Sequence, residues 1–140
     1  MKKYVYKKNI ELNKDDVFKL YDDAKWTAYT NNMPNLMDAI KNSLFVITAW
    51  DNDKLIGLVR IVGDGFTIIY IQDILVLESY RRKGIASNLM NKILNKYKDV
   101  RQKVLLTDEQ TANKMFYEKL GFRVCGKYEL VAFVRIDLVR

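Results

Sequence analysis

Apolar residues along the chain recur with two different periods, and the change between these periods separates helical from extended segments. In residues 14–23 and again in residues 34–41 apolar positions lie three or four residues apart, which is the spacing of one helix face. Between residues 44 and 77 the spacing shortens towards two, as in strands. A helical period returns at residue 84 and again at residue 110. The pattern therefore predicts a protein that combines helices with a sheet.

The two periods place the elements in the order β-α-α-β-β-β-α-β-α-β-β, which indicates an α/β fold with a mixed sheet. No repeat, linker or low-complexity segment interrupts this order, so we expect one domain over residues 1–140. The predicted helices are Lys14–Asp23, Pro34–Lys41, Gly84–Lys98 and Gln110–Leu120. The predicted strands are Tyr4–Lys8, Leu44–Trp50, Leu55–Val62, Phe66–Leu77, Lys103–Leu106, Phe122–Val124 and Leu130–Leu138.

Local signals support several of these boundaries. Asn13 is a predicted N-cap for the first helix, and Pro34 suits a first helical turn because its missing N–H is not needed there. The run Asp51–Lys54 predicts a hairpin turn, and Gly121 stands where a helix ends. The short apolar strand Lys103–Leu106 follows a helix, so we expect it to be buried and parallel to the strand before that helix.

Composition excludes several classes of protein. The hydrophobic content of 49% with 29% charged residues is typical of a globular protein. No apolar run approaches the ~20 residues of a membrane span, and the N-terminus lacks the apolar core of a signal peptide. One cysteine, Cys125, is compatible with a reducing cytosol, so we expect a cytoplasmic protein. We expect no membrane partner.

The absence of histidine restricts the chemistry. A Ser-His-Asp triad and a histidine-based zinc site are excluded, and one cysteine cannot provide a thiolate zinc or iron–sulfur site. We therefore expect no metal. The formal net charge of +7 favours a phosphate cofactor, nucleic acid or an anionic surface as partner. The basic residues are dispersed among acidic ones, which argues against a dedicated nucleic-acid-binding surface.

A basic loop stands between an apolar strand and a helix. Unpaired N–H groups at a helix N-terminus, together with the positive end of the helix dipole, bind anions. Gly84 allows a ligand to approach the backbone, and three cations precede it. The loop therefore predicts a diphosphate site, with a basic surface turn as the alternative. The residues of this stretch are Arg81, Arg82, Lys83, Gly84, Ile85, Ala86 and Ser87.

The element order and two motifs resemble the GNAT superfamily of acyl-CoA-dependent N-acetyltransferases. The family's motif Gln/Arg-x-x-Gly-x-Gly/Ala, after its fourth strand, reads here Arg81-Arg82-Lys83-Gly84-Ile85-Ala86. Its second signature is an Asn, a Tyr four residues later and then Gly-Phe, which corresponds to Asn113, Tyr117 and Gly121-Phe122. The resemblance extends over essentially the whole chain. The connector with Trp26 and Tyr29 also resembles that of small bacterial members.

The resemblance implies a GNAT-like acyl-CoA N-acyltransferase fold, with a mostly antiparallel central sheet whose fourth and fifth strands splay apart. It implies acetyl-CoA as co-substrate, with its pyrophosphate on the basic loop and its pantetheine arm paired to the fourth strand like an added strand. The expected cofactor-binding residues are Leu75, Val76, Leu77, Arg81, Arg82, Lys83, Gly84, Ile85, Ala86, Ser87, Asn113 and Phe116.

Tyr117 and Asp73 are the expected catalytic residues. Tyr117 would donate a hydrogen bond to the departing thiolate, or would alternatively be a half-buried aromatic. The site should remove a proton from the amine, through a carboxylate or an ordered water. Asp73 is the candidate general base, ahead of Glu78, with an equal alternative as a fixed structural or substrate-binding carboxylate. We expect Trp26 and Tyr29 to line the acceptor site.

The leading hypothesis is an acetyl-CoA-dependent N-acetyltransferase that acts on a primary amine. Two alternatives stay open: a non-catalytic acyl-CoA-binding sensor, and a basic nucleic-acid-associated acetyltransferase that acts on tRNA. The acceptor is open among small amines, amino acids, antibiotics and proteins.

An exposed final strand would allow a homodimer. Phe66 is expected to pack in the core, with a place at the mouth of the acceptor site as the alternative.

Overall fold

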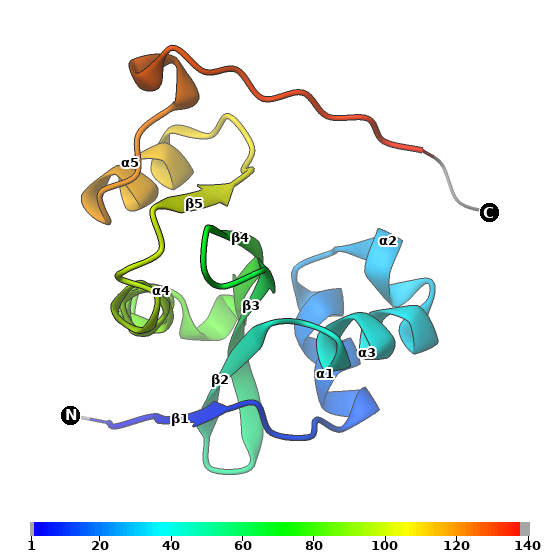
Figure 1. The fold of residues 1–140 in the computed structure, drawn as a ribbon. Helices are drawn as coiled ribbons and strands as arrows, with labels where there is room; N and C mark the ends of the chain where they lie inside the picture. Colours follow the sequence, from blue (N-terminus) through cyan, green and yellow to red (C-terminus); the bar gives the residue numbers. More distant parts are fainter. Residues whose placement is uncertain (1, 138–140) are drawn as a thin grey trace. The chain divides into compact units, whose positions relative to one another are not determined.

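The computed structural model describes residues 2–137 (Figure 1). The chain divides between Leu106 and Thr107 into two compact units. The first unit contains the sheet and the helices that cover it. The second contains the helix α5 (Thr111–Lys119) and the short 3-10 helix η2 (Cys125–Tyr128).

The first unit is built on one five-stranded sheet whose strands follow one another in sequence order. Neighbouring strands are antiparallel except for the last two, which are parallel, as the sequence predicted. The predicted mixed, mostly antiparallel sheet is therefore confirmed. The strands are β1 (Val5–Lys8), β2 (Phe45–Asp51), β3 (Lys54–Gly63), β4 (Ile68–Val76) and β5 (Gln102–Leu105).

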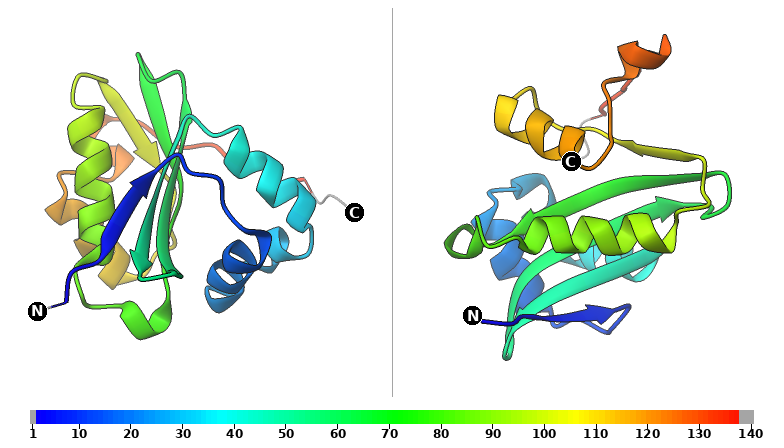
Figure 2. Two further views of the ribbon diagram at one scale, coloured as in Figure 1. Left: turned by 90° about the horizontal axis from the view of Figure 1, so that it is seen from below. Right: turned by 90° about the vertical axis from the view of Figure 1, so that its left-hand side faces the viewer.

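Helices cover both faces of this sheet (Figure 2). One face is covered by α1 (Lys14–Asp23), α2 (Thr27–Thr30) and α3 (Met33–Lys41), and the other by α4 (Ile85–Lys96). Two covered faces explain why β2 and β3 are buried along nearly their whole length rather than in alternation. None of the described helices is long and apolar enough to cross a membrane.

Side-chain caps begin two of the helices on the first face. The Asn13 side chain accepts hydrogen bonds from the N–H groups of Asp15 and Asp16, at 2.7 and 3.3 Å, which confirms the predicted N-cap of α1. Asn32 caps α3 and accepts from Asn35 N–H, so this helix begins just before the predicted position. The connector predicted between these helices contains the extra short helix α2.

A β-bulge interrupts β4 and decides the geometry of the site. Arg60 of β3 pairs with Asp73, whereas the next residue, Ile61, pairs with Ile71, so Gln72 has no opposite partner. The ladder between β4 and β5 also ends at Ile71, although β4 continues to Val76. Bulges bend and twist a strand locally. The outer edge of β4 beyond Ile71 therefore has no strand partner among residues 2–137.

The two strands predicted after α5 are wrong. Over residues 122–137 the chain forms η2 and otherwise irregular or extended backbone, and Leu138 lies outside the described residues. Phe122 N–H bonds to Tyr117 at the end of the helix instead of to a strand. An apolar pattern alone does not make a strand, and the described residues of the second unit contain no strand for this segment to pair with.

Phe66 was also expected in the core, and this is wrong: its side chain is 85% exposed. It lies in the turn between β3 and β4, where Asp64 accepts hydrogen bonds from the N–H groups of Phe66, Thr67 and Ile68. These bonds hold the turn away from the sheet, so β4 starts two residues later than predicted.

Candidate active site

The basic loop leads into α4 without a side-chain cap. Gly84 is the N-cap residue with φ 79°, and no side chain of the described chain caps the helix. The first N–H groups of the helix consequently lack intrahelical acceptors. Arg82 has φ 63°, a conformation that costs an L-residue energy and that clusters at functional sites. Arg81, Arg82, Lys83 and Gly84 are all exposed, so the loop presents unpaired N–H donors and cationic side chains to solvent.

Two contacts fix the 3-10 helix η1 (Glu78–Tyr80) that precedes this loop. The Asp23 carboxylate accepts a hydrogen bond of 2.8 Å from Glu78 N–H, and the Tyr80 hydroxyl donates to Asp51. The Tyr80 hydrogen bond and then Lys2 lower the pKa of Asp51. Sequence reasoning missed these anchors because the partners are 55 and 29 residues apart.

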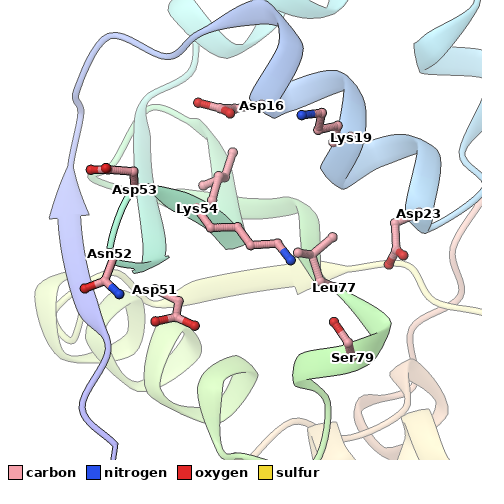
Figure 3. Close-up of a pocket in the computed structure, with 10 residues that line it drawn as sticks. Asp16, Lys19, Asp23, Asp51, Asn52, Asp53, Lys54, Leu77 and Ser79 are labelled. Atoms are coloured by element: carbon pink, nitrogen blue, oxygen red, sulfur yellow. The ribbon is translucent and has the colours of Figure 1, made fainter.

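A hollow of about 690 Å³ lies beside these anchors (Figure 3). Its walls come from α1, the β2–β3 hairpin and the segment after β4, and they combine carboxylates with two lysines. Asp23 and Asp51 in this wall hold η1, so two of the lining carboxylates support the segment that leads into the basic loop. The lining residues are Asp16, Lys19, Asp23, Asp51, Asn52, Asp53, Lys54, Leu55, Leu77 and Ser79.

The free edge of β4 carries backbone groups with a defined direction. Leu77 N–H bonds to Ile56 at 2.8 Å, on the β3 side. Because alternate residues of an antiparallel strand face the same neighbour, Leu75 also faces β3, whereas the N–H and C=O groups of Ile74 and Val76 face the free edge. An extended ligand would therefore find main-chain donors and acceptors at Ile74 and Val76, while the Leu75 and Leu77 side chains are buried.

Asp73 is the centre of a buried polar cluster in the first unit. Its side chain is 2% exposed, and its Oδ2 accepts from Tyr21 Oη at 2.8 Å and Arg60 Nε at 2.7 Å. Its Oδ1 accepts from Tyr29 Oη at 2.8 Å. Both carboxylate oxygens are thus engaged by donors. This geometry favours the alternative in which Asp73 is a fixed carboxylate.

Tyr21 and Arg60 are members of the cluster that sequence reasoning missed. A signal for the ion pair was present, because Arg60 and Asp73 are isolated opposite charges in two strongly apolar runs that form a hairpin. Buried charges are usually paired. Tyr21 gave no such signal, since its position in the apolar stripe of α1 only indicates burial.

Trp26 and Tyr29, the expected acceptor-side residues, lie together. Their ring centroids are 6.1 Å apart, and each ring also packs against Tyr21. Burial, followed by the charge of Asp73, raises the pKa of both Tyr21 and Tyr29. The two phenols are therefore neutral at physiological pH.

The predicted residues of the second unit share one face of α5. Asn113, Phe116, Tyr117 and Leu120 are its half-buried residues, and the others are exposed. Burial, followed by the charge of Asp108, raises the pKa of Tyr117. The Asn113 side-chain amide donates to Asp108 at 2.6 Å, which leaves its carbonyl oxygen as an acceptor. Among residues 2–137, no group of three or more His, Cys, Asp or Glu side chains is placed to hold a metal ion.

Removing Arg60 tests the energetic weight of the cluster. We expect Arg60→Met to lower the free energy of unfolding by about 3–5 kcal/mol, because it leaves the buried Asp73 charge without its cation. Urea unfolding followed by circular dichroism measures this. Lys2→Met is the matched control, since it removes an exposed ion pair with Asp51 and should leave the unfolding midpoint nearly unchanged. An Arg60→Met midpoint equal to that of the control would contradict the paired-charge description.

Comparisons with known proteins identify the family of the chain. Residues 8–136 match the model of the "Acetyltransferase (GNAT) domain". The chain is similar to the solved structure of the GNAT family acetyltransferase SP0256 from Streptococcus pneumoniae TIGR4, with 38% identity and a TM-score of 0.84, over 96% of this chain and 98% of that one. It is also similar to SA2161 from meticillin-resistant Staphylococcus aureus, with 25% identity and a TM-score of 0.78, over 96% and 100% of the two chains.

A third solved structure shares the fold at 18% identity: AAC(6')-Iy in complex with the bisubstrate analogue CoA-S-monomethyl-acetylneamine, with a TM-score of 0.74 over 98% of this chain and 100% of that one. A comparison with curated protein sequences finds no match. The family model covers nearly the whole chain, both predicted motifs included, and the chain therefore belongs to the GNAT acetyltransferase family.

Proposed function

We propose that this acetyltransferase is acetyl-CoA-dependent and transfers the acetyl group to the nitrogen of a primary amine. The observation that carries the proposal is the uncapped, basic N-terminus of α4 directly after a strand with a free main-chain edge. The uncapped helix N-terminus suits a diphosphate, and the free main-chain edge of the strand suits an extended arm that contains amide groups. Coenzyme A contains both groups. The bisubstrate complex of the neighbour AAC(6')-Iy supports the same co-substrate.

The residues present fit coenzyme A. A Cβ built on Gly84 meets no atom within 4 Å, so the backbone at the helix start is open to a ligand. The N–H groups of Ile85, Ala86 and Ser87, with the side chains of Arg81, Arg82 and Lys83, would hold the pyrophosphate. Ile74 and Val76 would offer main-chain groups to the pantetheine arm, beside the predicted Leu75 and Leu77. When bound, acetyl-CoA supplies an activated acyl group.

Tyr117 is proposed to stabilise the leaving group. The amine nitrogen bonds to the acetyl carbon, the carbon–sulfur bond breaks, and the sulfur leaves with the electron pair. Because the pKa of Tyr117 is raised, its hydroxyl holds its proton more firmly than a free phenol does. We therefore assign it a hydrogen bond to the thiolate rather than full proton transfer. Asn113 and Phe116, on the same face of α5, are proposed cofactor contacts.

We also propose that both units act as one N-acetyltransferase domain over residues 1–140, which is supported by the single family match across them. The proposed location is the cytoplasm. Cys125 is a free, exposed thiol, a state that a reducing compartment maintains.

Titration with coenzyme A tests the cofactor site. We expect saturable heat in calorimetry and a loss of affinity of more than about tenfold in the double variant Arg82→Gln/Lys83→Gln, because charge-assisted hydrogen bonds to phosphate are lost. The double variant Lys98→Gln/Arg101→Gln removes the same charge from exposed positions elsewhere and should bind normally. A folded wild-type protein that shows no heat at millimolar coenzyme A would rule out the proposed function.

The same protein, assayed for thiol release from acetyl-CoA with a broad amine panel, separates the alternatives. Binding without thiol release would favour the acyl-CoA sensor. Tight tRNA binding that weakens steeply with salt would favour the tRNA-directed enzyme.

Tyr117→Phe tests the leaving-group proposal. We expect kcat to fall about 10- to 100-fold, the worth of one hydrogen bond to a charged group. The pKa of Tyr117 in the folded protein is raised above the usual tyrosine value of about 10, so its hydroxyl stays protonated at any pH below about 10. Ionisation of Tyr117 should therefore not lower kcat in that pH range. Tyr128→Phe, at an exposed tyrosine of the same unit, is the control. Unchanged turnover of Tyr117→Phe removes this residue from the mechanism.

We propose further that two copies associate through the extended segment 130–136. Its apolar side chains are exposed, including Phe133 at 92%, and extended apolar backbone without a ladder is a template for another strand. Sedimentation velocity should show a dimer that Phe133→Asp converts to monomer. Phe66→Asp alters another highly exposed phenylalanine, which lies in a turn, and should leave the dimer intact. A wild-type monomer at all concentrations would contradict this association.

A further inference from the structure

Gln72 lies where two irregularities of β4 coincide. It is the bulged residue without an opposite partner on β3. It is also the first residue beyond Ile71, where the ladder with β5 ends. A ligand that extends from the basic loop along the free edge of β4 would reach Gln72 at the far end of this edge.

The bulge directs Gln72 and Asp73 to the same hydroxyl group. Consecutive side chains of a regular strand point to opposite faces. Here Gln72 Nε2 lies 3.1 Å from Tyr29 Oη, and Asp73 Oδ1 lies 2.8 Å from the same atom. The three side chains form a continuous hydrogen-bonded chain from the buried Asp73, through the half-buried Tyr29, to the exposed Gln72.

The direction of each hydrogen bond in this chain follows from its buried end. The Asp73 carboxylate, paired with Arg60, only accepts, so Tyr29 must donate its single proton to it. The Tyr29 oxygen then accepts from Arg60 Nη2 at 3.3 Å and from Gln72. Gln72 must therefore present its NH₂ group to Tyr29. Its carbonyl Oε1 is left as an acceptor without a partner among residues 2–137.

We propose that Gln72 binds the acceptor amine through Oε1, and that Arg60, Asp73 and Tyr21 are positioning residues that act on it through Tyr29. The proposal rests on the proposed function, because it takes the reacting end of the cofactor to lie at this end of β4. It also assigns a substrate class: amines that bind uncharged, with the α-amino type preferred over the lysine type.

The charge balance of the cluster is the reason for proposing an uncharged amine. The groups that face it are Tyr21 from α1, Tyr29 from α2, Arg60 from β3, and Tyr70 and Asp73 from β4. Arg60 and Asp73 cancel, and the phenols are neutral, so no net negative charge holds an ammonium ion. At pH 7 roughly one α-amino group in ten is uncharged, against one lysine-type amine in a few thousand.

An amide oxygen orients the amine but does not deprotonate it. The neutral nitrogen donates one N–H to Oε1 and directs its lone pair at the acetyl carbon. The carbon–nitrogen bond forms and the carbon–sulfur bond breaks, and the extra proton on nitrogen then passes to water.

Gln72→Ala measures the contact. With glycinamide as acceptor, we expect its KM to rise about tenfold, the worth of one hydrogen bond, while the KM for acetyl-CoA stays unchanged. Gln102→Ala is the matched control: it truncates an exposed glutamine of β5 at the paired end of the β4–β5 ladder. Tyr29→Phe should raise the same KM by a smaller factor, because Gln72 loses its fixed orientation but keeps its amide.

Gln72→Glu tests the charge argument. We expect the wild type to prefer glycinamide over n-butylamine, and this variant to lower the KM for n-butylamine, which it can bind as a cation. An unchanged order of preference would overturn the proposed substrate class.

Asp73→Asn separates this proposal from general-base catalysis. A positioning role predicts a change in the amine KM with an unchanged shape of the pH profile of kcat. A fall in kcat of about 10²- to 10⁴-fold with loss of the acid limb, together with a silent Gln72→Ala, would show Asp73 to be the base and overturn the proposal. If Asp73→Asn does not fold, the amine KM values of Gln72→Ala and Tyr29→Phe decide between the positioning role and general-base catalysis.

A wild-type protein that binds coenzyme A but releases no thiol would contradict the proposed acetyl transfer. It would not by itself contradict the proposed role of Gln72 in binding the amine. Gln72 is then tested by calorimetry of glycinamide with the coenzyme A-saturated protein. Weaker binding by Gln72→Ala supports its role, and equal or absent binding overturns it.

Discussion

A carboxylate that is taken out of water must be satisfied by its neighbours, and in the first unit this requirement joins four segments of the chain. Asp73 of β4 is held by Arg60 of β3, Tyr21 of α1 and Tyr29 of α2. An uncompensated charge there would cost several kcal/mol. The cluster therefore fixes where α1 and α2 lie on the sheet, and with them the side of β4 that the proposed acceptor approaches.

The same strand serves two kinds of binding because its two edges differ. On the β3 side β4 is paired almost throughout, and this pairing keeps it rigid. On the other side the ladder stops at Ile71, so Ile74 and Val76 keep free main-chain groups. A strand that was paired on both edges would have no groups to offer a ligand. The bulge at Gln72 thus changes local pairing, side-chain direction and the proposed chemistry together.

Most of the fold could be predicted from the sequence, because the signals involved are local. The N-cap Asn13 and the turn at residues 51–54 lie beside the elements that they define. The start of α4 after the basic loop could be predicted for the same reason. The anchors of that loop, Asp23 and Asp51, could not, since nothing in their own segments indicates what they contact.

Extended segments mark the limit of this kind of prediction. A helix bonds to itself, whereas a strand exists only if another strand pairs with it, and residues 122–137 have the pattern without the partner. The direction of the Gln72 side chain also depends on strand pairing and could not be predicted from the sequence. Its place in an alternating strand predicts a side chain on the face opposite to Asp73, and only the pairing register of β3 reveals the bulge that brings the two together.

Electrostatics along β4 are compatible with the proposed amine acceptor even though the protein has a net charge of +7. The cations of the basic loop lie beyond Leu77, and an extended chain from Gln72 to Leu77 spans roughly 16 Å at about 3.3 Å per residue. The Debye length at physiological salt is about 8 Å, so the loop could attract the proposed phosphate at one end with little repulsion of an approaching ammonium ion at the other. At the amine end Arg60 is neutralised by Asp73. Lower ionic strength lengthens the distance over which the charges of the loop act. Repulsion of charged amines should then increase, whereas uncharged amines should not be affected.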